Sequence, residues 1–168
     1  MANSSIISKS KNKIIKEFIK DTLLLQAIDS PTLDLKQAEK FIGTHIFDYN
    51  QNPYTLNNIE TFITVQVHIP ETYTYGKDTS NLWVYPTIEI WIISHERHMK
   101  VSNIPKVTAN RNDYISELID NKLNGRNDFG IGDISLLMNI EGSLQADYVY
   151  RKMVFKGTDI NNSLCNDE

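Results

Sequence analysis

The sequence predicts one α+β domain in which about three helices pack against a mainly antiparallel sheet of four strands. Apolar residues recur first at helical spacing, then alternate along two strands, and then form another helix and a final hairpin. This gives the order α-α-β-β-α-β-β. The chain has 168 residues, 40% hydrophobic and 23% charged, which is typical of one globular domain with its own core. We place this domain at residues 11–156, with a long arm at 70–83, between a flexible N-terminus at 1–10 and a flexible polar tail at 157–168.

Composition excludes several classes of protein. The formal net charge is −4, so the chain as a whole lacks the positive charge of a general nucleic-acid-binding protein. Cys165 is the only cysteine, which excludes a disulfide framework and a cysteine-based zinc cluster. No apolar run approaches the roughly 20 residues of a membrane helix, and residues 1–13 lack the apolar block of a secretory signal. We therefore expect no membrane partner and a reducing cytoplasm as the compartment.

The first helix is predicted at residues 11–26. Its buried face contains Ile14, Ile15, Phe18, Ile19 and Leu23. Lysines occupy much of the remaining surface, at positions 11, 13, 16 and 20. This basic face either binds phosphate groups or is simply solvated. The second interpretation is favoured because Glu17 and Asp21 interrupt the positive charge.

A second, short helix is predicted to begin at Ser30-Pro31, because proline suits the first helical position, where its missing N–H is not needed. Gly43 can end this helix in the left-handed conformation. The following segment, 44–58, is predicted as a loop with a brief strand at its start. His45 has no second ligand at a metal-binding spacing, so no metal site is predicted there.

Alternation of apolar and polar side chains predicts two long strands, at residues 59–69 and 82–94. Pro86 cannot donate a ladder hydrogen bond, so the start of the second strand is expected at a sheet edge or at a bulge. Trp91 and Ile93 make the second face of this strand partly apolar. We therefore expect another element or a neighbouring subunit to cover that face.

The arm at 70–83 is too long for a tight turn, and loops of this length are often functional or mobile. Tyr73, Tyr75 and Trp83 lie in it, and Tyr85 follows directly. Tyrosine and tryptophan are enriched at the centres of protein interfaces, so the arm is predicted to touch another protein. Alternatively, these tyrosines pack on their own sheet. The sequence favours neither interpretation.

Two apparent ligand motifs do not meet the geometric needs of their chemistry. His95 and His98 lie three residues apart at the end of a strand, whereas a zinc-binding helix needs histidines four apart. The glycines of 125–132 lack the Lys-Ser or Lys-Thr of a phosphate loop and precede a strand instead of a helix. These glycines are therefore predicted to shape turns.

A third helix is predicted after the Ile-Pro-Lys sequence at 104–106. Asn110 or Asn112 caps its start, and Gly125 ends it. Asp113 near the start and Lys122 near the end suit the helix dipole. The buried face contains Ile115, Leu118, Ile119 and Leu123.

A hairpin closes the domain. Its first strand alternates through Ile134, Leu136 and Met138, and its turn is predicted at 141–143. Arg151 lies on the apolar face of the last strand. It is either paired locally or placed at a subunit interface, and both alternatives stay open.

A set of short sequences in the C-terminal third carries a resemblance. They are Ile104-Pro105-Lys106, Asn112-Asp113-Tyr114, Leu123-Asn124-Gly125, Phe129-Gly130-Ile131-Gly132, Asn139 with Glu141-Gly142, and Tyr150-Arg151 with Phe155. In these sequences the chain resembles the neck and tail-terminator proteins of tailed bacteriophages. The resemblance implies a structural virion protein, assembled in the host cytoplasm as a ring, a hexamer, that caps the tail tube and joins it to the head connector. DNA would pass through the lumen without specific binding. The resemblance implies no catalytic, cofactor-binding or metal-binding residues.

Ring contacts are heterologous, so each subunit must present two different complementary patches. The tyrosine-rich arm and the Trp91 side of the second strand are the candidates. The residues predicted at subunit or partner interfaces are Tyr73, Tyr75, Trp83, Tyr85, Trp91 and Arg151.

Three alternatives fit the same sequence less well or no better. Another connector of the same particle, such as a head-completion or baseplate component, is not separated from the tail terminator. A small nuclease or hydrolase would need paired carboxylates, and the available ones have no recognisable spacing; they include Glu89, Glu96, Asp113 and Asp133. The last alternative is a non-viral adaptor recognised through the arm.

Overall fold

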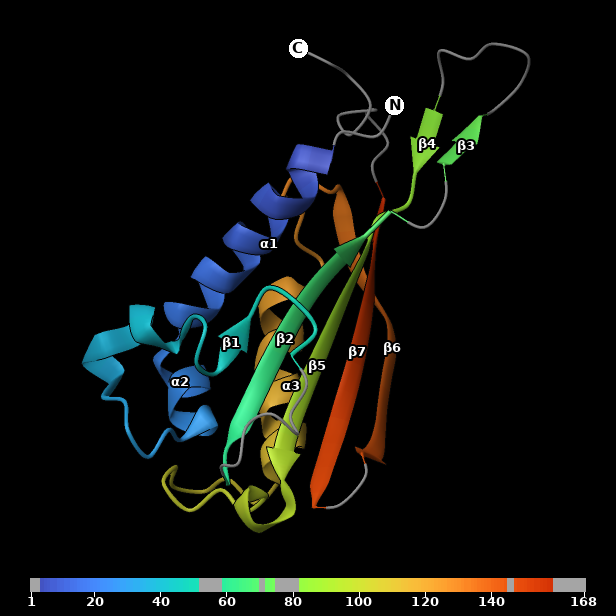
Figure 1. The fold of residues 1–168 in the computed structure, drawn as a ribbon. Coiled ribbons are helices and arrows are strands. Elements are labelled where there is room, and N and C mark those ends of the chain that lie inside the picture. The colour runs from blue at the N-terminus through green and yellow to red at the C-terminus, as the bar shows by residue number, and fades with distance from the viewer. Residues whose placement is uncertain (1–3, 52–58, 70–71, 75–81, 145–146, 159–168) are drawn as a thin grey trace.

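The computed structural model describes residues 4–51, 59–69, 72–74, 82–144 and 147–158. The elements are, in order, α1 (Ser4–Ile19), α2 (Thr22–Ile28), η1 (Leu35–Phe41), β1 (Ile46–Phe47), β2 (Thr61–His68), β3 (Thr72–Thr74), β4 (Leu82–Val84), β5 (Thr87–His95), η3 (Glu96–His98), α3 (Arg111–Leu123), β6 (Asp133–Leu144) and β7 (Tyr148–Thr158). Five strands form a sheet in the order β1-β2-β5-β7-β6 (Figure 1). The predicted α+β class is confirmed, and the brief strand β1 joins the four predicted antiparallel strands by pairing in parallel with β2.

The main core lies between the three α-helices and one face of the sheet. The register places Ile63 opposite Ile92 and Ile90 opposite Met153, so successive strands present apolar side chains on the same face. These residues join the buried faces of α1, α2 and α3 in one cluster. Each large apolar side chain buried in this way stabilises the fold by roughly 1.5–3 kcal/mol.

The N-terminal helical region differs from its prediction in two ways. The helix begins at Ser4, not Lys11, because Ile6 and Ile7 pack against the core and the buried Ser10 hydroxyl donates to the Phe129 carbonyl at 3.0 Å. The predicted single helix at 11–26 is also divided in two. Asp21 has an extended backbone and its carboxylate accepts from the amides of Leu23 and Leu24, so it caps a second helix.

The predicted helix start at Ser30-Pro31 is wrong. The Ser30 hydroxyl accepts from the Leu33 amide at 3.1 Å in a local turn, and the helical segment begins later, at η1, with Asp34 as its cap. Gly43 adopts φ +78 and its amide donates to the Ile46 carbonyl at 2.9 Å. The left-handed conformation predicted for this glycine is therefore present and starts the turn into β1.

Pro86 divides the strand predicted at 82–94. Before it, β4 pairs with β3 in a separate two-stranded ladder; after it, β5 occupies the centre of the main sheet. The Pro86 carbonyl accepts from the Gly157 amide at 2.7 Å. The break places the β3–β4 hairpin beyond one end of the sheet (Figure 1).

The turn predicted at 141–143 is also wrong. These residues continue β6 and pair with Arg151, Tyr150 and Val149 of β7, and the chain reverses only after Leu144. Strand β7 likewise continues to Thr158, so the predicted tail overlaps its end, and 159–168 lie outside the described residues.

Candidate subunit interface

The face of the sheet opposite the helices is partly apolar along β5, β7 and β6; we call it the open face. The register places Trp91 beside Lys152 and Lys152 beside Ile140, and a second row joins Glu89, Val154 and Met138. In Figure 1, α3 lies behind β2 and β5, on the other face. The residues on the open face are therefore positioned by strands whose reverse side is fixed in the main core.

Trp91 is held in place at the middle of the open face. Its ring lies 4.7 Å from the Tyr150 ring, and its indole N–H donates to the Glu89 carboxylate at 2.6 Å. Lys152 pairs with the same carboxylate at 2.9 Å and lies 4.9 Å above the Trp91 ring. Burial raises the pKa of Glu89, but the hydrogen bonds from Trp91 and Lys152 outweigh it and lower the pKa below its usual value. A fixed aromatic side chain loses little conformational freedom when a partner covers it.

Part of this face is already covered near the other end of the strands. Phe62 and Ile93 are buried in a second, smaller cluster with Phe47 and Tyr148. Trp91 and Tyr150 are half-buried at the border of that cluster. The expectation of a covered second face therefore holds for this cluster through contacts within the chain.

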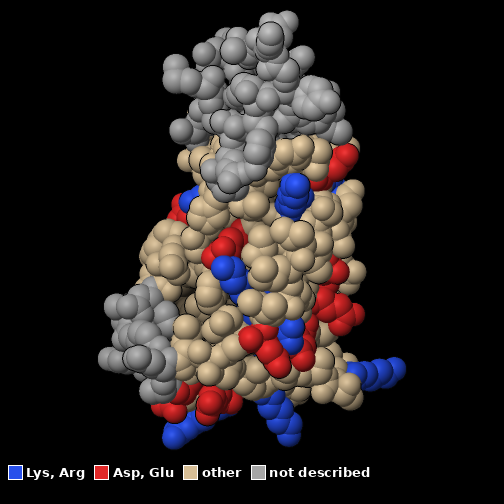
Figure 2. Space-filling view, turned by 90° about the vertical axis from the view of Figure 1, so that its right-hand side faces the viewer, with Lys and Arg blue, Asp and Glu red and all other residues tan. Residues whose placement is uncertain are grey.

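Strand β6 forms one edge of the sheet and presents what we call the β6 edge patch: Leu137, Met138 and Ile140. Their exposed fractions are 64%, 41% and 45%. Near its start, the outer backbone edge of β6 is hydrogen-bonded, because the Leu136 amide donates to the Asn124 side chain at 3.1 Å. Beyond Leu136, no strand pairs with this edge among the described residues. Figure 2 faces this side of the molecule and shows a broad uncharged surface interrupted by scattered charged side chains. An apolar, unpaired edge strand is a template for association with another chain.

A β-bulge produces the exposure of Leu137. The register passes from Leu136, opposite Phe155, to Met138, opposite Val154, so Leu137 is an extra residue without a partner on β7. A bulge bends the strand and redirects side chains. Met138, predicted as the third inward residue of the strand, therefore lies on the open face instead of in the core.

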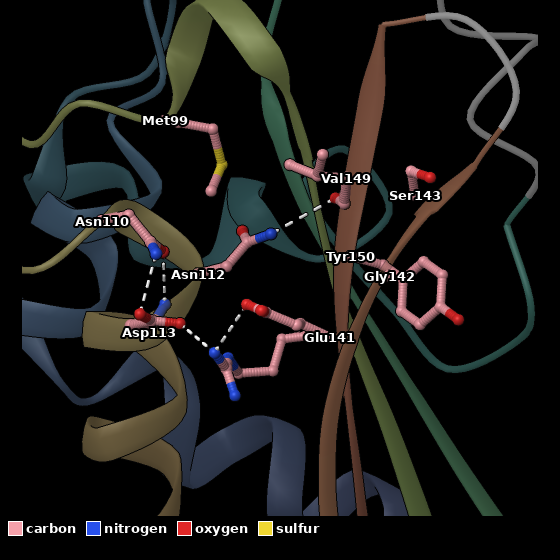
Figure 3. A pocket seen from close by; sticks show the side chains of 10 residues that line it. Met99, Asn110, Asn112, Asp113, Glu141, Gly142, Ser143, Val149 and Tyr150 are labelled. Carbon is pink, nitrogen blue, oxygen red and sulfur yellow. Dashed lines mark hydrogen bonds and ion pairs between the residues drawn. The ribbon is translucent and has the colours of Figure 1, made fainter.

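Arg151 lies on the helix side of β7, in a pocket of about 300 Å³ (Figure 3). Its guanidinium forms ion pairs with Asp113 of α3 and, at 3.2 Å, with Glu141 of β6, and donates to Asn139 at 3.1 Å. Asp113 is itself fixed by the helix cap, since Asn110 donates to its carboxylate at 2.7 Å and accepts from its amide. Of the two alternatives left open by the sequence, the structure shows local pairing. Of the two predicted caps, Asn110 is the one that is used.

A chain of buried polar side chains runs from this pocket across the sheet, from β7 through β5 to β2. Asn112 donates to the Val149 carbonyl at 3.2 Å and accepts from the Ser94 hydroxyl at 2.6 Å. The Ser94 hydroxyl lies 2.8 Å from that of Thr61, which lies 2.9 Å from Nδ1 of His98. These groups satisfy one another, which is the condition for burying them without a large cost in stability.

Arg111 completes this network at the end of α2. It is 1% exposed, donates to the carbonyls of Ala27, His98 and Lys100, and pairs with Asp29 at 3.1 Å. Burial and the nearby guanidinium of Arg111 lower the pKa of His98. The cluster joins α2, η3 and α3 through polar contacts and leaves the arginine no donor pointing to solvent.

The six interface residues predicted from the sequence do not converge on one surface. Tyr73 and Trp83 are register partners in the β3–β4 hairpin, and Tyr75 lies outside the described residues. Tyr85 lies beyond the hairpin, with the Lys156 ammonium 4.1 Å from its ring centre. Trp91 belongs to the open face, whereas Arg151 is ion-paired within the chain on the opposite face of the sheet.

Sequence reasoning missed the β6 edge patch and the buried Arg111. The signal for the first was present: Leu136, Leu137 and Met138 are three consecutive apolar residues, where a half-buried strand would alternate. Arg111 gave no signal, because a charged residue in the first turn of a helix is ordinarily solvated.

In the part of the chain that the structure describes, no group of three or more His, Cys, Asp or Glu side chains is arranged to hold a metal ion. Among the described helices, none combines the length and apolar character needed to cross a membrane.

The fold and its exposed strand define the class: a small α+β domain whose sheet has an exposed apolar edge. In a comparison with known families, residues 9–157 match the YomW family. The chain belongs to the YomW family, whose name is suggestive of a Bacillus phage-derived protein. A search of curated proteins found no match.

Proposed function

We propose that this chain is a structural protein of a tailed-phage virion: a neck or tail-terminator component whose copies form a ring. The ring, a hexamer, caps the tail tube and joins it to the head connector, and DNA passes through its lumen without specific binding. The observation that carries the proposal is the β6 edge patch. A strand of 12 residues at the sheet edge exposes three large apolar side chains, in a chain whose family name is suggestive of phage origin.

The physical argument is the cost of leaving this surface in water. Monomeric proteins usually protect edge strands with charges, prolines, bulges or covering segments. The β6 edge patch has a bulge, but the bulge turns the apolar Leu137 outward; between Leu137 and Ile140 there is no charge or proline, and no segment among the described residues covers these side chains. Burying it against another protein removes apolar area from water at about 25 cal/mol per Å² and satisfies the exposed backbone. This supports a role in assembly.

The polar sites also support a role without catalysis. Arg151 is paired with two carboxylates, and Asn112 both donates and accepts within the chain. Side chains committed in this way hold β6, β7 and α3 together. A rigid domain with an exposed apolar edge can serve as a repeated building block of a ring, in which that edge supplies one of the two patches of each contact.

Purified protein tests the proposal directly. We expect multi-angle light scattering to give a discrete oligomer and negative-stain images to show rings, with the protein alone or after addition of tail-tube protein. A compact monomer that neither forms rings nor binds tube or connector protein contradicts the proposal.

Another connector or a baseplate component of the same particle is the alternative position. The density of the protein in a virion reconstruction separates the two: density between the tail tube and the head connector supports the tail terminator, and density elsewhere supports the alternative.

A further inference from the structure

A second apolar surface lies at the sheet edge opposite the β6 edge patch. We call it the β1-side pocket; it has a volume of about 160 Å³ and is lined by residues that include Ile15, Lys16, Ile42, Phe47 and Tyr49. Two of its apolar side chains are open to solvent: Ile42 is 40% and Tyr49 52% exposed. The strand order β1-β2-β5-β7-β6 places this pocket at one edge of the sheet and the patch at the other.

The size of the pocket fits one large apolar side chain. A cavity of about 150 Å³ lined by apolar residues is large enough to hold a benzene molecule. Leu137 projects from the bulge of β6 and is the most exposed member of its patch. It is therefore the side chain best placed to enter such a pocket on another molecule.

The charges around the two surfaces favour contact between them over contact of each with itself. Strand β6 contains Asp133 and Glu141 and no lysine or arginine, and both residues are exposed; Glu141 pairs with Arg151 of the same chain, whereas Asp133 forms no ion pair among the described residues. The pocket is bordered by the exposed Lys16, which forms no ion pair among the described residues, and by Asp48, whose carbonyl accepts from Lys11. Two β6 edges brought together would place the two Asp133 carboxylates at an acidic contact to which neither strand contributes a lysine or arginine, which is unfavourable.

From these observations we propose that the β6 edge patch of one copy occupies the β1-side pocket of a second copy. The inference rests on the proposed function and deepens it by naming both halves of the contact. Because the halves lie at opposite edges of one sheet, every bound copy still offers a patch on one side and a pocket on the other. Such a head-to-tail contact is heterologous and forms a closed ring when the rotation between copies closes.

Cysteine crosslinking tests the pairing. In a Cys165→Ser background, Leu137→Cys and Ile42→Cys are made as separate variants and co-expressed, and the oligomer is isolated and oxidised with copper phenanthroline. We expect a disulfide-linked dimer in the co-expressed sample and none in either variant alone. The Leu23→Cys variant is the matched control: Leu23 is 46% exposed on α2 and belongs to neither surface, so its mixture with Leu137→Cys should not crosslink.

A second measurement does not depend on disulfide geometry. Leu137→Asp should weaken self-association about tenfold or more in sedimentation experiments, because it places a charge in an apolar contact. Leu23→Asp should leave association unchanged. Since both side chains are exposed, both variants should keep the folded far-ultraviolet spectrum of the parent protein.

The outcomes separate this inference from the proposed function. Efficient crosslinking of Leu137→Cys alone means that β6 meets β6 and overturns the inference. A discrete oligomer that forms no crosslink in the mixed sample also overturns it, yet leaves the virion role intact. A protein that stays monomeric, even with tail-tube protein, contradicts both.

Discussion

Replacing Arg111 with methionine removes every donor from the most deeply buried charged side chain among the described residues and keeps much of its aliphatic stem. Arg111 is 1% exposed. Its guanidinium group donates to the carbonyls of Ala27, His98 and Lys100, the last two at 2.5 and 2.9 Å, and pairs with Asp29 at 3.1 Å. The substitution therefore leaves three backbone acceptors and one carboxylate without this partner.

The expected loss follows from these groups. An acceptor left buried without a donor costs about 1–3 kcal/mol, and removing one partner of a buried ion pair costs about 3–5 kcal/mol. The Asp29 side chain is 37% exposed and keeps a hydrogen bond from Asn103 at 3.1 Å, so its carboxylate is partly rehydrated and contributes less than the full penalty. We expect Arg111→Met to lower the free energy of unfolding by about 3–5 kcal/mol.

Arg126→Met is the matched control. Arg126 is 34% exposed and pairs with Glu17 and Asp128 near the surface, where such pairs contribute at most about 1 kcal/mol. Urea denaturation followed by far-ultraviolet circular dichroism measures both variants, with a similar slope expected in each. If Arg111→Met were no more destabilising than Arg126→Met, the conclusion that the buried polar network holds α2, η3 and α3 together would be wrong.

Two further predictions concern the polar groups near the sheet. Burial and the Arg111 guanidinium lower the pKa of His98 below its ordinary 6.5, so the unfolded chain binds a proton at higher pH than the folded one. The resulting stability is fully present above about pH 6.5 and is lost as the pH falls through the folded pKa. The free energy of unfolding should therefore drop less between about pH 7.5 and 5.5 in His98→Gln than in the parent protein. An equal drop in the two proteins would contradict the prediction. Arg151→Met should lower the free energy of unfolding by about 1–2 kcal/mol, because two partly exposed carboxylates lose their partner, while light scattering shows an unchanged oligomer; dissociation of the oligomer would instead place Arg151 at a subunit contact.

Sequence patterns predicted those elements whose signals are local. The third helix has its cap at Asn110 and its buried face at Ile115, Ile119 and Leu123, all within one segment. The break at Asp21 was not predictable from periodicity, because α1 and α2 bury their apolar residues in the same core and the helical spacing continues across the cap.

The misplaced hairpin turn has a tertiary cause. Glu141-Gly142-Ser143 has the composition of a turn, yet Gly142 lies inside β6 because the Tyr150 ring occupies the space of a side chain there. A Cβ at this position would lie 2.5 Å from the Tyr150 hydroxyl oxygen. The site was missed for related reasons: the exposure of Leu137 depends on a bulge, and the burial of Arg111 depends on carbonyls from distant segments. Neither dependence is visible in local spacing.

The bulge in β6 also has a consequence for how this sheet tolerates changes in chain length. Loss or gain of one residue within a strand ordinarily turns every later side chain to the opposite face. Here Leu136 and Met138 already occupy consecutive register positions opposite Phe155 and Val154. In a chain that lacks Leu137, β6 would therefore pair with β7 in a regular ladder, and all the remaining side chains would keep their present faces. A change of length at this one position would alter the side chains that the β6 edge presents to a neighbouring molecule, while the rest of the domain would keep its structure.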